Sequence, residues 1–380
     1  MQRNIMNERI IWFEMDEEKR KRARRIVEGH FHVYEQKCEG DVCAFFCDVA
    51  GDPEEPFSLL VNELKNECMI PILRREGGEH VIYATIAPKN TKTRGIWVNV
   101  ALLVATIITT TIAGAIIVYG NANIGKAIEL AKIFEPNYLA EGALYFSIPL
   151  MLILGIHELG HYFASRKHGI AATLPYFIPI PPIGFPLGTM GAFISTKEPI
   201  TNRKALMDIG AAGPICGLLV AIPVTMVGLW LNTINPVIAE PTAEGMAWLG
   251  TPLLFDALSY FFRTPPNALM HPTAFAGWAG MLITAINLLP AGQLDGGHIV
   301  RALIGEKQKY VSMAALAGMI IAGFFFTGWL FFAMLILFMG TRHPPPLNDV
   351  TPLDTRRKII GIIAIIMFVL CFVPVPISGG

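Results

Sequence analysis

The sequence predicts a polytopic α-helical membrane protein of about seven spans, with a small soluble α+β domain at its N-terminus. Two observations predict this fold class. First, 53% of the 380 residues are apolar and only 16% are charged, whereas soluble domains average roughly 25% charged residues. Second, uncharged stretches of 23 residues or more recur after residue 96, and ~20 apolar residues suffice for a helix to cross a bilayer.

Residues 1–95 are expected to form the soluble domain. A basic and exposed helix, containing E-K-R-K-R-A-R-R at 18–25, comes first. An amphipathic stretch follows at 56–67, among strand-like runs at 31–35, 44–49, 70–75 and 81–86. This order of elements predicts a compact α+β unit. We expect it to have a regulatory partner, which the sequence does not identify.

Four of the six cysteines lie in this first domain, at Cys38, Cys43, Cys47 and Cys68. They could form a zinc or iron–sulfur set. However, Cys43 and Cys47 occupy alternate positions of one strand-like run, so both would point to the same face. Because free cysteine behaves as a small apolar residue, the pattern favours buried core thiols.

Residues 96–380 are expected to form the membrane domain. The run Tyr310–Thr341 would measure ~48 Å as one helix at 1.5 Å per residue, which is too long for one crossing, so we predict a break near Gly323–Gly328. The expected spans are therefore Ile96–Tyr119, Gly142–Ile156 continuing into the next residues, Ile209–Leu231, Pro272–Leu294, the two limbs of the 310–341 hairpin, and the apolar run from Ile359 to the C-terminus.

Positive charge predicts how these spans are oriented. Lys89, Lys92 and Arg94 precede the first span, and cytoplasmic loops are enriched in Lys and Arg. We therefore expect a multi-pass protein of the cell membrane whose N-terminal domain faces the cytoplasm. The formal net charge is zero, so nothing in the composition indicates binding to nucleic acid.

The second span carries the motif H-E-L-G-H at 157–161. On a helix, His157 and His161 are one turn apart on the same face, so both imidazoles can bind one metal ion. Glu158 lies on the flank of that face, where it can reach a water molecule beside the metal. Ionisable groups inside a membrane are costly and usually mark function. The alternative is a buried polar cluster that links helices.

A catalytic zinc normally takes three protein ligands, and the best candidate for the third is Asp295. It lies 134 residues after His161, at the end of the fourth span. By the predicted topology, both spans bring these residues to the cytoplasmic side. Pro290 and Gly292 would interrupt the fourth span just before Asp295. Asn287, an amide within an apolar span, would donate a hydrogen bond either to an oxyanion or to a neighbouring helix.

H-E-L-G-H followed by N-L-L-P-A-G-Q-L-D-G-G (287–297) resembles the site-2 proteases, intramembrane zinc metalloproteases with the motifs H-E-x-x-H and N-x-x-P-x-x-x-x-D-G. The resemblance covers about 143–305, the expected catalytic core, and is greatest to archaeal and chloroplast members. It implies one Zn²⁺ held by His157, His161 and Asp295, with Glu158 as the general base. It also implies hydrolysis of peptide bonds in or near the transmembrane segments of membrane-protein substrates in a lipid bilayer.

A transmembrane substrate must be unwound before it can be cut, because its helix hides its carbonyl groups. The stretch 174–195 holds five prolines within Pro175–Pro186 and then a strand-like run. In related proteases this region forms a hairpin, and an unpaired strand edge could hold an extended substrate. We expect the substrate-binding residues to be Gly191, Ala192, Phe193 and Ile194. The alternative is a plain cytoplasmic loop.

Three other functions fit the sequence less well. A zinc transporter would use the same ligands, but transporters tend to contain internal repeats, and none is visible in the sequence. A prenyl-protein metalloprotease would need a downstream glutamate ligand where this chain has Asp295. A catalytically silent scaffold is disfavoured because the motif is intact.

Overall fold

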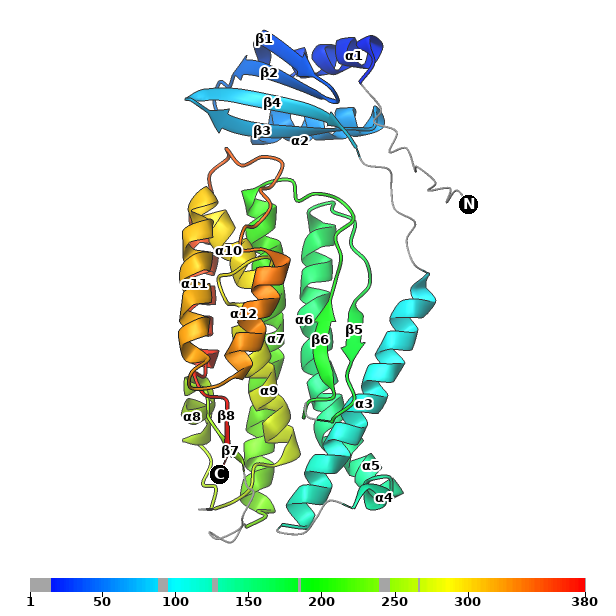
Figure 1. The fold of residues 1–380 in the computed structure, drawn as a ribbon, viewed down its shortest axis with the longest axis vertical. Coiled ribbons are helices and arrows are strands. Elements are labelled where there is room, and N and C mark those ends of the chain that lie inside the picture. The colour runs from blue at the N-terminus through cyan, green and yellow to red at the C-terminus, as the bar shows by residue number, and fades with distance from the viewer. Residues whose placement is uncertain are drawn as a thin grey trace, which may run out of the picture. The chain divides into compact units, whose positions relative to one another are not determined.

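The computed structural model divides the chain into two compact units by its internal contacts (Figure 1). Unit 1 comprises Met1–Lys92, Thr201–Arg203 and Pro345–Pro352, and unit 2 comprises Thr93–Ile200, Lys204–Pro344 and Leu353–Gly380. The structure describes residues 15–87, 95–124, 129–183, 186–238, 247–265 and 267–379.

Unit 1 is a four-stranded antiparallel sheet with two helices on one face. The strand order is β1-β2-β4-β3. Alternate residues of β2 are buried and join residues of both helices in one apolar core, as expected for a sheet with one covered face. The elements are α1 (Glu17–Glu28), β1 (His32–Glu39), β2 (Val42–Asp48), α2 (Glu54–Asn66), β3 (Met69–Glu76) and β4 (Glu79–Ile86).

Two segments distant in sequence complete unit 1. Leu347 belongs to its apolar core, and the backbone N–H of Leu73 on β3 donates to the Leu347 carbonyl at 2.8 Å. The backbone N–H of Asn348 in turn donates to the carbonyl of Thr201 at 2.8 Å. The edge of β3 is thus paired with residues that follow far along the chain, a contact with no sequence signature.

The cysteines differ in part from the sequence prediction. Cys47 is a buried free thiol, as expected. The prediction of core thiols is wrong for Cys38 and Cys43, which form a disulfide, although Cys43 is buried, and for Cys68, which is exposed. Cys38 and Cys43 are cross-strand partners in the β1–β2 hairpin, which brings their sulfurs together.

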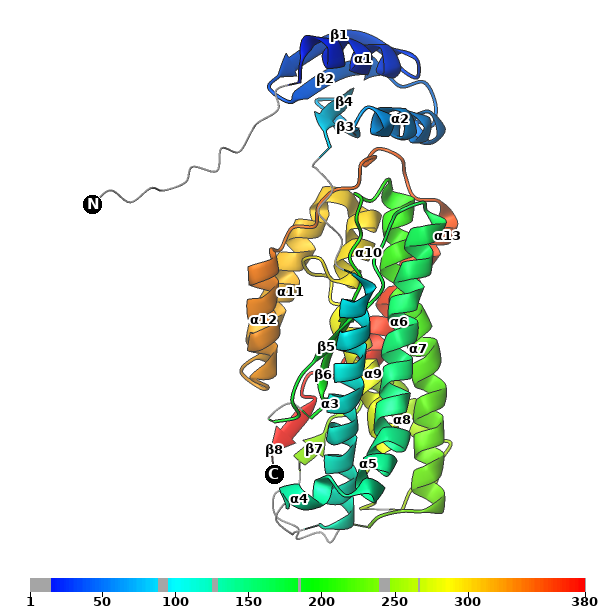
Figure 2. The same cartoon turned by 90° about the vertical axis from the view of Figure 1, so that its right-hand side faces the viewer.

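Unit 2 is mostly helical (Figure 2). Among the described residues, three helical segments are long and apolar enough to cross a membrane, at Ile96–Ala122, Pro136–Lys167 and Arg203–Ile234. The predicted count of seven spans is not confirmed, because the remaining apolar helices have 17 residues or fewer. The elements are α3 (Ile96–Ala122), α4 (Leu130–Ile133), α5 (Pro136–Gly142), η1 (Ala143–Ser147), α6 (Ile148–Lys167), β5 (Tyr176–Pro179), β6 (Thr189–Phe193), α7 (Arg203–Ile234), β7 (Ala247–Leu249), α8 (Leu253–Ser259), α9 (Pro272–Asn287), α10 (Asp295–Ile304), η2 (Gly305–Lys307), α11 (Gln308–Ala322), α12 (Gly328–Met339), α13 (Thr355–Cys371) and β8 (Ile377–Gly379).

The long apolar run after residue 310 is broken where the sequence predicts a break. Helix α11 ends at Ala322 and α12 begins at Gly328, and the two helices contact each other as a hairpin (Figure 1). With 15 and 12 residues, they measure about 22 Å and 18 Å at 1.5 Å per residue. Each limb by itself is shorter than the ~30 Å hydrocarbon core.

Candidate metal and active site

Helix α6 places three ionisable side chains in the interior of unit 2. His157, Glu158 and His161 are 4%, 5% and 6% exposed, although the part of α6 that precedes them is apolar. The spacing of four residues brings the two imidazoles onto the same face, with ring centroids 4.9 Å apart. Buried ionisable groups need partners, and these come from other helices.

Asp295 reaches the two histidines because the fourth predicted span is broken. Helix α9 ends at Asn287, and α10 begins at Asp295 itself. The chain folds tightly between them: a Cβ at Gly296 would lie 2.1 Å from the Leu288 carbonyl oxygen. Only glycine allows this approach, which accounts for the D-G pair and directs the Asp295 carboxylate toward α6.

The three side chains form a ligand triangle. His157 Nε2 lies 3.1 Å from His161 Nε2, and Asp295 Oδ2 lies 3.3 Å and 3.2 Å from those two atoms. Donors at 2.0–2.1 Å around a tetrahedral zinc are separated by about 3.3–3.4 Å. Two nitrogens and one carboxylate oxygen, at nearly this spacing, fit a catalytic zinc site with one open position. No other such cluster of three His, Cys, Asp or Glu residues occurs among the described residues.

The backbone of α7 determines which nitrogen of His161 is available. His161 Nδ1 lies 2.8 Å from the carbonyl oxygen of Ile209, and a carbonyl can only accept, so Nδ1 must carry the proton. In the neutral ring, Nε2 then presents its lone pair to the triangle, as a metal ligand requires. Sequence reasoning did not find this contact, because a backbone acceptor has no residue signature.

Two glycines of α7 make room for the histidine rings. A Cβ at Gly213 would lie 2.0 Å from His161 Nε2, and one at Gly217 would lie 3.0 Å from His157 Nδ1. The stretch A-A-G-P-I-C-G (211–217) forms part of the family resemblance, but the sequence alone does not show that its glycines face the H-E-L-G-H helix.

Asn287 lies at the C-terminal end of α9, next to the triangle. Its Nδ2 is 3.4 Å from His157 Nε2. The amide is therefore close enough to donate a hydrogen bond to a group that enters the open position.

The predicted substrate-binding stretch reaches the same site from another direction. Residues 191–193 belong to β6, which pairs antiparallel with β5, and Phe193 stacks on Tyr176 of that strand. The backbone N–H of Ile194, directly after β6, lies close enough to the Glu158 carboxylate to stabilise its charged form. The end of the hairpin therefore lies against the proposed general base.

Three histidines without a predicted role make specific contacts. The rings of His298 and His343 lie 4.3 Å apart in an edge-to-face arrangement, and both residues are buried or half-buried. His168, at the C-terminal end of α6, binds Asp208 of α7 at 2.8 Å. Arg357 of α13 also binds Asp208, through Nε at 2.8 Å and Nη2 at 2.6 Å. This ion cluster joins three helices near the histidine motif.

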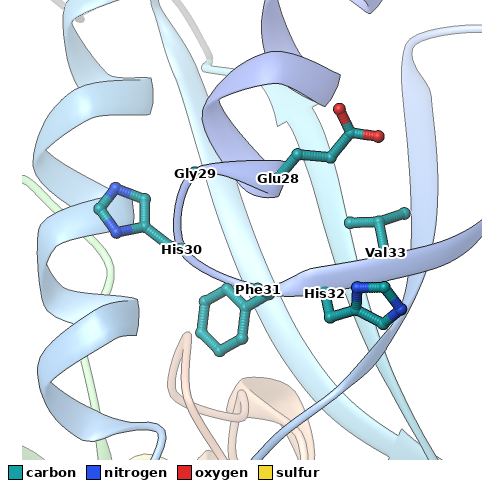
Figure 3. Close-up of a pocket in the computed structure, with 6 residues that line it drawn as sticks. All are labelled: Glu28, Gly29, His30, Phe31, His32 and Val33. Carbon is teal, nitrogen blue, oxygen red and sulfur yellow. The ribbon is translucent and has the colours of Figure 1, made fainter.

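A shallow pocket of about 530 Å³ in unit 1 contains none of the predicted site residues (Figure 3). It lies at the turn between α1 and β1, where His30 Nε2 is 3.1 Å from a carboxylate oxygen of Glu63. We assign it no role. Its lining consists of Glu28, Gly29, His30, Phe31, His32 and Val33.

Comparisons with known proteins agree with this geometry. The family profile described as Peptidase family M50 matches residues 145–330. The probable zinc metalloprotease EGY1, chloroplastic, of Arabidopsis thaliana is 32% identical over 245 residues, which are 62% of this chain and 43% of that protein. The probable zinc metalloprotease EGY2, chloroplastic, of the same plant is 28% identical over 261 residues, 66% of this chain and 45% of that protein. The chain thus spans less than half the length of these relatives. No solved structure matches.

The matched residues and these relatives, which are named as probable zinc metalloproteases, define the class of protein that this chain resembles, and three of its helices are long and apolar enough to cross a membrane. Residues 145–330 match the model of peptidase family M50, and the predicted resemblance to the site-2 proteases is confirmed.

Proposed function

We propose that this chain is an intramembrane zinc metalloprotease, which hydrolyses peptide bonds within or near the transmembrane segments of membrane proteins. The observation that carries the proposal is the ligand triangle of His157, His161 and Asp295, with Glu158 buried beside it on α6. Its three sides of 3.1–3.3 Å fit one zinc ion.

Each residue of the site has a separate role in the proposed reaction. Bound zinc would supply Lewis-acid polarisation of the attacking water and of the scissile carbonyl. Glu158 takes the proton from the attacking water and returns it to the leaving amine. Asn287 donates its amide N–H to the oxyanion that develops on the carbonyl oxygen. The backbone N–H of Ile194 stabilises the charged form of the Glu158 carboxylate.

The substrate would bind as an extended strand along Gly191, Ala192, Phe193 and Ile194. Within the described residues, β6 pairs with β5 alone, so its second edge can accept a strand. Proline at position 193 removes a backbone N–H from β6 and disturbs the pairing that holds the strand in place. We expect Phe193→Pro to abolish cleavage and to leave zinc content unchanged; wild-type cleavage would rule out binding at this edge.

We place the chain in the cell membrane, with the soluble domain (residues 1–95) and the active site toward the cytoplasm and 96–380 crossing the bilayer about seven times. The positive residues that precede α3 support this orientation, although Lys89, Lys92 and Arg94 lie outside the described residues. The Cys38–Cys43 disulfide runs against it, because disulfides are rare in reducing compartments. An impermeant maleimide applied to intact cells decides the question: the exposed Cys68 should react only after lysis.

The proposed activity is tested with the purified chain in lipid vesicles and a labelled single-span substrate. Wild-type protein should cut the substrate, chelation should stop cleavage, and added zinc should restore it. Glu158→Gln should keep its zinc and lose cleavage. A zinc transporter or binding protein would instead show zinc binding and no cleavage by the wild type, which would overturn the proposal.

A further inference from the structure

Two polar side chains of helix α3 bind the β5–β6 hairpin, which lies between α3 and α6. Asn99 is 8% exposed, and its Nδ2 donates to the carbonyls of Leu174 at 2.9 Å and Pro175 at 3.0 Å. Thr109 Oγ1 lies 2.7 Å from the carbonyl oxygen of Gly188. Strand β5 runs beside α3 in both views (Figures 1 and 2).

These contacts hold both ends of the hairpin. Leu174 and Pro175 come just before β5, and Gly188 comes just before β6. Carbonyl groups in an apolar medium must find donors, and the prolines of this stretch have no N–H to offer. The polar groups of α3 therefore replace bonds that the hairpin cannot make internally.

The Thr109 contact is specific to the hairpin. A hydroxyl has one proton to donate, and its distances to the carbonyls of Ala105 and Thr106 in its own helix are both 3.1 Å, longer than the 2.7 Å to Gly188. The backbones also meet closely here: a Cβ at Gly188, whose φ is +72°, would lie 2.5 Å from the Thr109 carbonyl oxygen.

The opposite side of the hairpin is the proposed active site. Strand β6 contacts α6, and the backbone N–H of Ile194 lies close enough to the Glu158 carboxylate to stabilise its charged form. A hairpin held on one side by α3 presents its open edge on the other side, beside the ligand triangle.

We propose that Asn99 and Thr109 are positioning residues, which hold the β5–β6 hairpin on α3 so that the edge of β6 stays aligned with Glu158. This inference rests on the proposed function, in which that edge binds the substrate strand. The two residues act on substrate alignment, and the zinc ligands are held independently by α6, α7 and α10.

The test compares Asn99→Leu and Thr109→Val, which remove the donors with little change of shape. The control is Thr106→Val on the same helix, because the Thr106 hydroxyl is buried and bonds to Leu102 of α3 itself. A lost hydrogen bond should raise KM for the single-span substrate roughly three- to tenfold, with zinc content unchanged. Thr109→Ser keeps the hydroxyl and should restore wild-type KM.

A second readout does not depend on cleavage. Hydrogen exchange of the backbone amides in 171–197 should be faster in Asn99→Leu and Thr109→Val than in wild type and Thr106→Val. Wild-type KM and exchange in both variants, or equal changes in the control, would overturn the inference. If wild-type protein does not cleave, the proposed function fails, while the exchange measurement still decides whether α3 holds the hairpin.

Discussion

Replacing Gly213 with alanine puts a methyl group into the space that the His161 ring occupies. The added Cβ would lie 2.0 Å from Nε2 and 2.5 Å from both neighbouring ring carbons. Ordinary contact begins at 3.4 Å, so the ring or the helix must move by about 1.4 Å (3.4 − 2.0). His161 has little freedom to move, because it is 6% exposed and its Nδ1 is bound to Ile209.

Such a displacement is large for a metal ligand. Ligand distances in working sites stay within about 0.2 Å of their ideal values, so a shift of 1.4 Å removes His161 from the ligand set. Changes that only misorient a ligand cost roughly 10- to 100-fold in metal affinity, and Gly213→Ala should cost at least the upper figure. Gly217→Ala places its Cβ 3.0 Å from His157 Nδ1, and the smaller overlap should give a weaker effect.

The assay is competition for zinc against a chelator of known affinity, with cleavage measured in parallel. Gly155→Ala is the matched control, because it lies on α6 and a Cβ there meets nothing within 4 Å. The expected order of zinc affinity is wild type and Gly155→Ala, then Gly217→Ala, then Gly213→Ala. Wild-type zinc affinity in a folded Gly213→Ala protein would refute this account of how α7 packs against the histidines.

Two further predictions concern groups away from the ligand triangle. Arg357→Ala removes both guanidinium contacts to Asp208 and should lower the free energy of unfolding by about 2 kcal/mol, which corresponds to about 4–8 °C in the apparent melting temperature. The control is Arg356→Ala, because Arg356 is exposed. Equal melting temperatures of the two variants would contradict the role of the ion cluster. Burial raises the pKa of the Cys47 thiol to about 11, so only about one thiol in a thousand is ionised at pH 8. Iodoacetamide at pH 8 should therefore modify the exposed Cys68 before Cys47. The rate of Cys47 modification should rise about tenfold per pH unit up to pH 10. A modification rate of Cys47 that does not depend on pH would contradict the raised pKa.

The sequence was sufficient to predict which side chains meet at the ligand triangle. The four-residue spacing of His157 and His161 follows from helix geometry alone. Asp295 follows from the predicted topology, because the second and fourth spans run in the same direction and end on one side of the membrane. The broken span before Asp295 was visible as proline and glycine.

Contacts made by the backbone or through close approach could not be predicted. The Ile209 carbonyl that orients His161 is present in any residue, so no pattern marks it. Gly213 belongs to a recognisable stretch, but only the packing of α7 on α6 shows what its missing side chain allows. The pairing of Cys38 with Cys43 depends on the register of a hairpin, and the lengths of α11 and α12 are not revealed by an unbroken apolar run.

The central claim is that His157, His161 and Asp295 hold one zinc ion. It is tested most directly by X-ray absorption at the zinc edge, with metal content measured on the same purified protein and on Asp295→Ala. The account predicts one zinc per chain with two imidazole nitrogens and oxygen donors completing the shell, and loss of zinc in Asp295→Ala. Two results would contradict this prediction: wild-type protein that contains no zinc although it was purified without chelators, or an unchanged zinc spectrum in Asp295→Ala.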